Sequence, residues 1–237
     1  TREAAIARNW LPMSGAERTA EHGLDFVLVT GDAYVDHPSF ANAVITRLLE
    51  SKGYRVGVLA QPDWKDAEAF AVFGAPRIAW LVSAGNLDSM LNNYTAHKKP
   101  RSDDQYSPGG EGGKRPDYAT VVYGQRCRQV AKDVPIIAGG VEVSMRRLAH
   151  YDYWSDKIRK SMILDSRADL VVYGMGEKPL LEIISRLKAG QPVSACREIR
   201  GVGFAVGKRG LPHFVADGEG GGDWIEDLPK GVVRLPD

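Results

Sequence analysis

Short apolar runs alternate with helical patterns along most of the chain. Residues 26–29 and 54–59 are apolar, β-branched runs of the kind found in strands that are buried on both faces. Between them, residues 40–52 repeat apolar side chains at helical spacing, and Gly53 follows as a helix C-terminal cap. The order strand, helix, strand predicts a βαβ unit at the start of the fold.

The same alternation continues beyond this unit. We expect further strands at residues 77–82, 134–138 and 170–173, and helical segments near residues 67–73, 118–131 and 180–189. Crossovers between parallel strands are right-handed, and each face of a sheet needs helices to cover it. The pattern therefore predicts an α/β fold with a doubly wound, mainly parallel five-stranded sheet of the Rossmann or flavodoxin type.

Two regions depart from this regularity. Residues 92–116 are polar and rich in glycine, and a loop of this length beside the carboxyl edge of a sheet can act as a lid. After residue 191 the alternation ends, and residues 200–206 and 213–216 are expected to pair as a hairpin. We therefore expect a Rossmann-like domain over residues 1–190 and a small β-rich tail with a linker over residues 191–237.

Composition narrows the class of protein. Among 237 residues, 43% are hydrophobic and 26% are charged, which is ordinary for a folded globular chain. The net charge of +1 provides no general field for nucleic acid, and the apolar runs are far shorter than the roughly 20 residues of a membrane span. The first residues lack the apolar centre of a secretory signal, so we expect a cytoplasmic protein without a membrane segment.

The cysteines exclude several kinds of site. Cys127 and Cys196 are the only two, and they are far apart in the sequence. They predict neither a disulfide framework nor a CxxC metal site. We expect two reduced thiols and no metal ligands in this chain.

Candidate chemistry gathers at one edge of the predicted sheet. Ligands of open parallel sheets bind outside the carboxyl ends of the strands, near the point where strand order reverses. Glycine pairs in these loops let the backbone approach a ligand. Each pair alone is more typical of a tight turn, but three such loops at one edge favour a ligand site. The candidate ligand-binding residues are Thr30, Gly31, Asp32, Asp36, His37, Ser83, Gly139, Gly140, Glu142, Gly174, Gly176 and Glu177.

Other functions have weaker support. Asp36 and His37 could exchange a proton, but neighbouring side chains point apart unless a turn reorients them, so we assign no catalytic residue. Residues 146–160 mix aromatic and basic side chains, which is compatible with an RNA-binding surface but more typical of a solvated face at helical spacing. A hydrolase is not indicated, because no GxSxG or HExxH motif is present.

Residues 28–40 (LVTGDAYVDHPSF) resemble the opening signature of the YgiQ-like radical S-adenosylmethionine (SAM) proteins, the UPF0313 type. The resemblance continues through residues 60–64 (AQPDW), 93–96 (NYTA), 98–104 (KKPRSDD), 106–110 (YSPGG) and 149–156 (AHYDYWSD). Ala41 departs from the family, which usually carries glycine there. The resemblance therefore covers nearly the whole chain up to residue 190.

The resemblance implies an N-terminal domain that precedes a radical SAM barrel in the same full-length protein. The barrel would hold a 4Fe–4S cluster through a CxxxCxxC motif and bind S-adenosylmethionine. This chain has no such motif, so it is expected to stop before the cluster-binding part and to lack catalysis of its own. Its partners would be that barrel and a small substrate of unknown identity.

The loops at residues 139–140 and 174–177 also resemble cobalamin-binding domains. Such domains can supply histidine from an Asp-x-His-x-x-Gly loop, whereas Asp36 and His37 are adjacent here. The sequence is compatible with cobalamin bound without a protein ligand to cobalt, and equally with no corrinoid at all. Two functions follow: an accessory domain that places a substrate or second cofactor near the barrel, or a non-catalytic module for a corrinoid or nucleotide.

Overall fold

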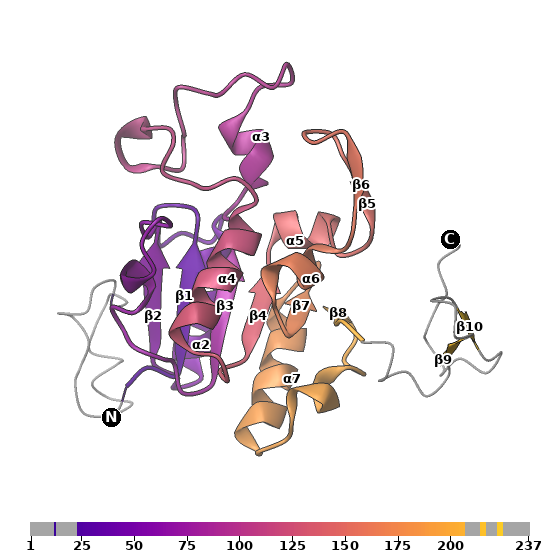
Figure 1. Cartoon of the computed structure of the whole chain (residues 1–237). Helices are drawn as coiled ribbons and strands as arrows, with labels where there is room; N and C mark the ends of the chain where they lie inside the picture. Colours follow the sequence, from indigo (N-terminus) through magenta and orange to yellow (C-terminus); the bar gives the residue numbers. More distant parts are fainter. Residues whose placement is uncertain (1–11, 13–22, 207–213, 217–221, 225–237) are drawn as a thin grey trace. The chain divides into compact units, whose positions relative to one another are not determined.

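The computed structural model describes residue 12 and residues 23–206, 214–216 and 222–224. Contacts within the chain divide it into two units, Thr1–Phe204 and Ala205–Asp237. The first unit is built on a six-stranded sheet with the strand order β2-β1-β3-β4-β7-β8 (Figure 1).

Five parallel strands form most of this sheet, as the sequence predicts. They are β1 (Phe26–Thr30), β2 (Val56–Ala60), β3 (Ala79–Ser83), β4 (Ile136–Gly139) and β7 (Leu170–Val172). The sixth, β8 (Val202–Gly203), lies antiparallel to β7. The chain goes from β1 to β2 on one side and then returns to β3 on the other, so the strand order reverses between β1 and β3.

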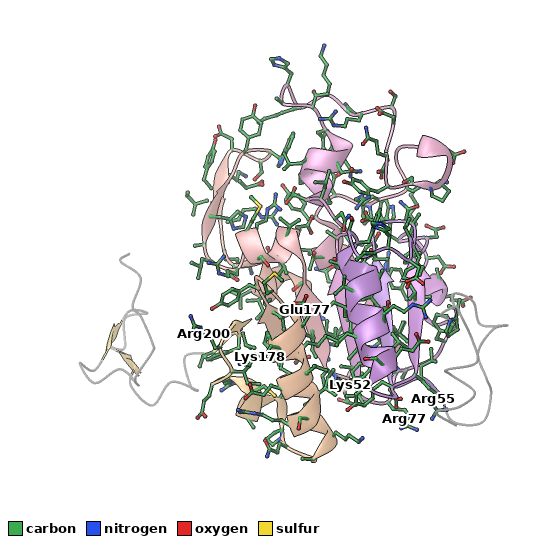
Figure 2. The ribbon with its side chains drawn as sticks, turned by 180° about the vertical axis from the view of Figure 1, so that it is seen from behind. Lys52, Arg55, Arg77, Glu177, Lys178 and Arg200 are labelled. Carbon is green, nitrogen blue, oxygen red and sulfur yellow. The ribbon has the colours of Figure 1, made fainter. Side chains whose placement is uncertain are left out.

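Helices cover both faces, which confirms the doubly wound α/β class. On one face lie α2 (Ala41–Ser51) and α7 (Glu177–Lys188), which Figure 2 shows from behind. Leu49 of α2 and Ile183 of α7 pack in one core cluster with strand residues. On the other face lie α4 (Ala119–Val130) and α6 (Met162–Ser166), with the 3₁₀ turn η2 (Glu68–Phe70) (Figure 1). Both faces of the sheet are therefore buried, as continuous apolar strands require.

Several local expectations were wrong. Residues 67–73 form only the turn η2, because the chain bends at Gly74 with a positive φ of 68° before a helix can extend. Residues 146–160 do not form a helical face. They contain the hairpin of β5 (His150–Asp152) and β6 (Lys157–Arg159), whose turn includes Asp156 at φ 53°.

Three arginines around this hairpin are engaged within the protein. The guanidinium of Arg159 lies 4.5 Å from the ring centre of Tyr118, and that of Arg147 lies 4.8 Å from Tyr173. Arg146 forms an ion pair with Asp88. These contacts hold the hairpin against the loops of the sheet.

The expected hairpin of the tail was also wrong. Within residues 200–206, Val202 and Gly203 pair with β7 and complete the main sheet. In the second unit, β9 (Phe214–Ala216) pairs with β10 (Gly222–Trp224) in an antiparallel ladder. Residue 213, the expected start of the second strand of that hairpin, lies outside the described residues.

The long loop over residues 92–116 is tied to the carboxyl edge of the sheet. It begins in the last two residues of the short helix α3 (Ser89–Asn93) and includes the 3₁₀ turn η3 (Pro108–Gly110). The amide of Ala33 donates to the carbonyl of Tyr106 at 2.8 Å, and Gln61 Nε2 donates to Ser107 Oγ at 2.6 Å. Opening this loop as a lid would therefore break hydrogen bonds to two strand ends.

Among the described residues, no helix is both long and apolar enough to cross a membrane.

Candidate ligand-binding site

A pocket of about 210 Å³ lies between α2 and α7 at the carboxyl edge of the sheet. Its floor is formed by the sheet residues Leu28, Leu81 and Ile137, which lie on neighbouring strands. Ile45 of α2 and Leu180 of α7 form opposite walls. The interior is therefore mainly apolar and suits a hydrophobic or aromatic group.

The pocket lies where the strand order reverses. Its floor spans β1 and β3, the two strands on either side of the reversal, and continues onto β4. This is the position at which open α/β sheets bind ligands. Six of the twelve sequence-predicted residues line it: Ser83, Gly139, Gly140, Gly174, Gly176 and Glu177.

Position 140, at the rim of the pocket, requires glycine. Gly140 has a φ of 94°, and a Cβ there would lie 2.8 Å from Ser83 Oγ. A side chain at 140 would therefore strain the backbone and press on Ser83. At Gly139 the conformation is ordinary, and an added Cβ would meet only the carbonyl oxygen of Val172, at 3.6 Å.

The rim also carries the polar groups of the pocket. Glu177 begins α7 and lines the pocket, and Figure 2 shows it at the end of that helix nearest the sheet edge. Ser83 Oγ accepts a hydrogen bond from the amide of Gly85 at 3.1 Å. An apolar ligand with polar groups at one end would match the apolar interior and polar rim of this pocket.

Asn42 and Ala41 line the pocket from α2, and sequence reasoning did not select them. Asn42 Nδ2 donates to Thr30 Oγ1 at 2.6 Å and so fixes the start of α2 to the end of β1. The methyl group of Ala41 occupies space on this side of the pocket.

Asp32 is part of a buried ion cluster and does not line the pocket. Its Oδ1 lies 2.8 Å from Arg115 Nη1, both side chains are 0% exposed, and Arg115 Nη2 lies 3.2 Å from Asp104. Burial raises the pKa of Asp32, and the charge of Arg115 opposes that rise. The cluster joins the loop after β1 to the segment before α4.

Thr30 and Gly31 also have internal roles. Thr30 is fully buried and receives the hydrogen bond from Asn42. A Cβ at Gly31 would overlap the carbonyl oxygen of Ala84 and crowd Arg115. Both residues bring neighbouring strand ends together, and neither lines the pocket.

Asp36 and His37 lie outside the pocket and have separate partners. Hydrogen bonds from Arg47 to Asp36, at 2.5 Å for the closest pair of atoms, lower the pKa of that carboxyl. His37 Nδ1 accepts from the amide of Ser39 at 3.1 Å, and both residues are exposed. The two side chains are therefore held by neighbours on their own loop and helix.

Glu142 connects three helices from a buried position. It is 1% exposed, and its carboxylate accepts from the amide of Ser89 at 2.8 Å and from that of Thr120 at 2.9 Å. These amides belong to the first turns of α3 and α4, where backbone donors lack helical partners. Glu142 is thus a shared cap that positions the loops of the sheet edge.

Replacing Glu142 by alanine is expected to lower the free energy of unfolding by about 3 kcal/mol, because two buried amides lose a charged acceptor. Urea denaturation followed by circular dichroism measures the change, with the exposed Glu198→Ala as the matched control. Ligand affinity at the pocket should stay within about twofold of wild type. Unchanged stability with lost binding would instead show that Glu142 contacts the ligand.

Comparison with known proteins identifies the family. A family model described as "Radical SAM N-terminal" matches residues 10–236. The chain belongs to the radical SAM N-terminal family. The resemblance drawn from the sequence is confirmed by curated relatives of the YgiQ-like UPF0313 group.

These relatives of the radical SAM N-terminal domain are similar over most of the chain. A UPF0313 protein of Bradyrhizobium diazoefficiens is 55% identical over 232 residues, covering 96% of this chain and 34% of its own length. One from Rhodopseudomonas palustris is 57% identical over 81% of the chain and 29% of its own length. YgiQ of Escherichia coli is 51% identical over 86% and 28%. The chain therefore spans about a third of the length of these relatives.

Two solved structures share the fold of this radical SAM N-terminal domain. Both are of the radical S-adenosylmethionine methyltransferase TsrM from Kitasatospora setae, at 21% identity and over 78% of this chain. One contains tryptophan substrate and a SAM analog, with a TM-score of 0.51, and covers 29% of that enzyme. The other contains cobalamin and a [4Fe-4S] cluster, with a TM-score of 0.50 and 27% coverage. They confirm the predicted fold class.

The chain's own residues do not fit an iron–sulfur cluster. Cys127 and Cys196 are both buried, and burial raises the pKa of each thiol, which disfavours the thiolate that iron requires. Across residues 23–206 and the other described positions, no group of three or more His, Cys, Asp or Glu side chains could hold a metal ion.

Proposed function

We propose that this chain is the ligand-binding N-terminal domain of a radical SAM protein, and that it holds a substrate or second cofactor at the carboxyl edge of its sheet. The observation that carries the proposal is the apolar pocket at the reversal of strand order, with glycines at its rim. The 4Fe–4S cluster and S-adenosylmethionine would be bound by the part of the longer protein that follows this domain, the radical SAM barrel.

A corrinoid is the first ligand to test. The pocket's apolar floor and walls suit the flat benzimidazole of cobalamin's nucleotide tail, with the corrin ring outside the pocket. Gly139, Gly140 and Gly174 also line the pocket and leave room for backbone contact. A bound cobalamin would bring radical and group-carrying chemistry to the domain. His37 is exposed and outside the pocket, so we expect no histidine ligand from this loop to cobalt.

The test is titration of the purified chain with hydroxocobalamin and adenosylcobalamin, followed by visible absorbance and calorimetry. The proposal predicts saturable binding with one site and a dissociation constant below about 100 μM. It also predicts a spectrum without the signature of histidine bound to cobalt. No saturable change with either cobalamin would exclude a corrinoid from this pocket.

A nucleotide is the second candidate, favoured by the helix that begins at the rim. α7 is 12 residues long, and its first turn borders the pocket through Gly176 and Glu177. Backbone amides at such a helix start can receive phosphate oxygens. Binding of ATP or AMP that hydroxocobalamin does not displace would favour this candidate over the first.

A further inference from the structure

A second pocket, of about 170 Å³, lies in the segment between α3 and α4. Among the described residues, it shares no lining residue with the first pocket. A water molecule occupies roughly 30 Å³ of liquid, and an apolar cavity of about 150 Å³ can admit benzene. The second pocket is therefore large enough for a compact molecule of about six non-hydrogen atoms.

Two of its lining residues are buried hydrogen-bond donors without a partner among the described residues. Asn92 is 7% exposed and its Nδ2 is unpaired, and Arg115 is 2% exposed and its Nε is unpaired. A buried donor without an acceptor costs about 1–3 kcal/mol. Because both groups are donors, the matching occupant supplies oxygen acceptors.

Carboxylates line the same pocket. Asp117 accepts from Asn93 Nδ2 at 2.9 Å and from Tyr94 Oη at 2.8 Å, which fixes its orientation, and Asp103 is exposed. The positive charge of Arg115 is already matched by Asp32 and Asp104.

The charges lining this pocket favour a ligand that carries both a cationic and an oxygen-acceptor group. Arg101 adds one cation to the lining, and its Nε donates to the carbonyl of Tyr94 at 3.1 Å. With Arg115 neutralised, Asp103 and Asp117 outweigh Arg101, so a free anion such as phosphate is disfavoured. A molecule with a cationic ammonium beside oxygen acceptors satisfies both the carboxylates and the unpaired donors.

We propose that this pocket binds an α-amino acid through its ammonium and carboxylate groups. The carboxylate would accept from Asn92 and Arg115, and the ammonium would lie against Asp103 and Asp117. This site is independent of the function proposed for the first pocket. It would give the domain a second small-molecule site in the loop over residues 92–116, for which the sequence suggested a lid.

The test is a titration of the ¹⁵N-labelled full chain with L-alanine, observed by nuclear magnetic resonance. We expect saturable shifts of the Asn92 side-chain amide and the Arg115 Nε–H signals. Acetate carries only the carboxylate group and methylamine only the ammonium group. Each should give less than about a fifth of the shift that L-alanine gives at equal concentration, and inorganic phosphate should give none.

Asp103→Asn is the decisive variant, because Asp103 is exposed and its replacement leaves the core unchanged. It should raise the dissociation constant for L-alanine at least about tenfold. Asp133→Asn, at another exposed carboxylate, should leave it unchanged. The proposal is overturned by absence of saturable shifts up to about 50 mM, by equal binding to Asp103→Asn, or by phosphate shifting the same signals.

Discussion

Replacing Arg115 by methionine is expected to lower the free energy of unfolding by about 3–5 kcal/mol, the largest effect of any single substitution considered for this domain. Arg115 is the cation between two buried carboxylates, Asp32 and Asp104, and it also donates to the carbonyl of Ala84. Its removal leaves both carboxylates buried without a countercharge. Urea denaturation at pH 7 measures the loss, with the exposed Arg200→Met as the control.

The pH dependence of this loss has a defined sign. Burial already raises the pKa of Asp32, and without Arg115 it should rise further above the value near 4 of the unfolded chain. The folded variant then takes up a proton as the pH falls, which relieves the buried charge. The stability difference from wild type should therefore be largest at neutral pH and shrink towards about pH 4. A difference that grows as the pH falls would contradict this account of the cluster.

Replacing Gly139 by leucine is expected to weaken ligand binding at the first pocket by at least about 100-fold. Gly139 lines the pocket in an ordinary backbone conformation, and its added Cβ would meet only Val172. A leucine side chain can therefore enter the ligand space without straining the strand. Titration with hydroxocobalamin, monitored by absorbance, compares the variant with wild type.

Gly203→Leu provides a matched control for this substitution. Gly203 lies in β8 outside the pocket, and its added Cβ would meet Val171 Cβ at 3.8 Å, an ordinary contact. The control should bind like wild type, and both variants should give the circular dichroism spectrum of the folded chain. Equal binding by Gly139→Leu and wild type would place the ligand elsewhere.

The parallel strands were predictable because their signal is local. A few consecutive residues are enough to predict an apolar strand such as β3 and the loop after it. The parallel arrangement of the strands then follows from the helical crossovers between them. The loops after β4 and β7 were placed at one edge for the same reason. Half of the candidate residues line the pocket, because each of them lies at or shortly after the end of a strand, which fixes its position.

The remaining candidates depend on long-range pairing. Asp32 meets Arg115 across 83 positions of sequence, and Glu142 reaches amides of two other helices. No periodic pattern connects such residues, so the sequence could not distinguish a ligand contact from an internal ion pair or cap. Asp32 and Glu142 were therefore selected as candidate ligand contacts, whereas in the structure they form an ion pair and a helix cap.

Some missed elements did leave a local signal. Asp88 caps α3 by accepting from the amides of Met90 and Leu91, and Ser161 caps α6 by accepting from that of Ile163. Both are residue types typical of helix N-termini. The pairing of β8 with β7 had no comparable signal, because two residues are too few to show a strand period.

The central claim is that the ligand of this domain binds between α2 and α7 at the carboxyl edge. Hydrogen exchange of the purified chain, with and without saturating hydroxocobalamin, tests the location directly. The account predicts slower exchange at amides of residues 83–85, 139–143 and 174–180, which border the pocket. Protection confined to the opposite edge, where Lys52, Arg55 and Arg77 lie (Figure 2), or no protection at all, would contradict it.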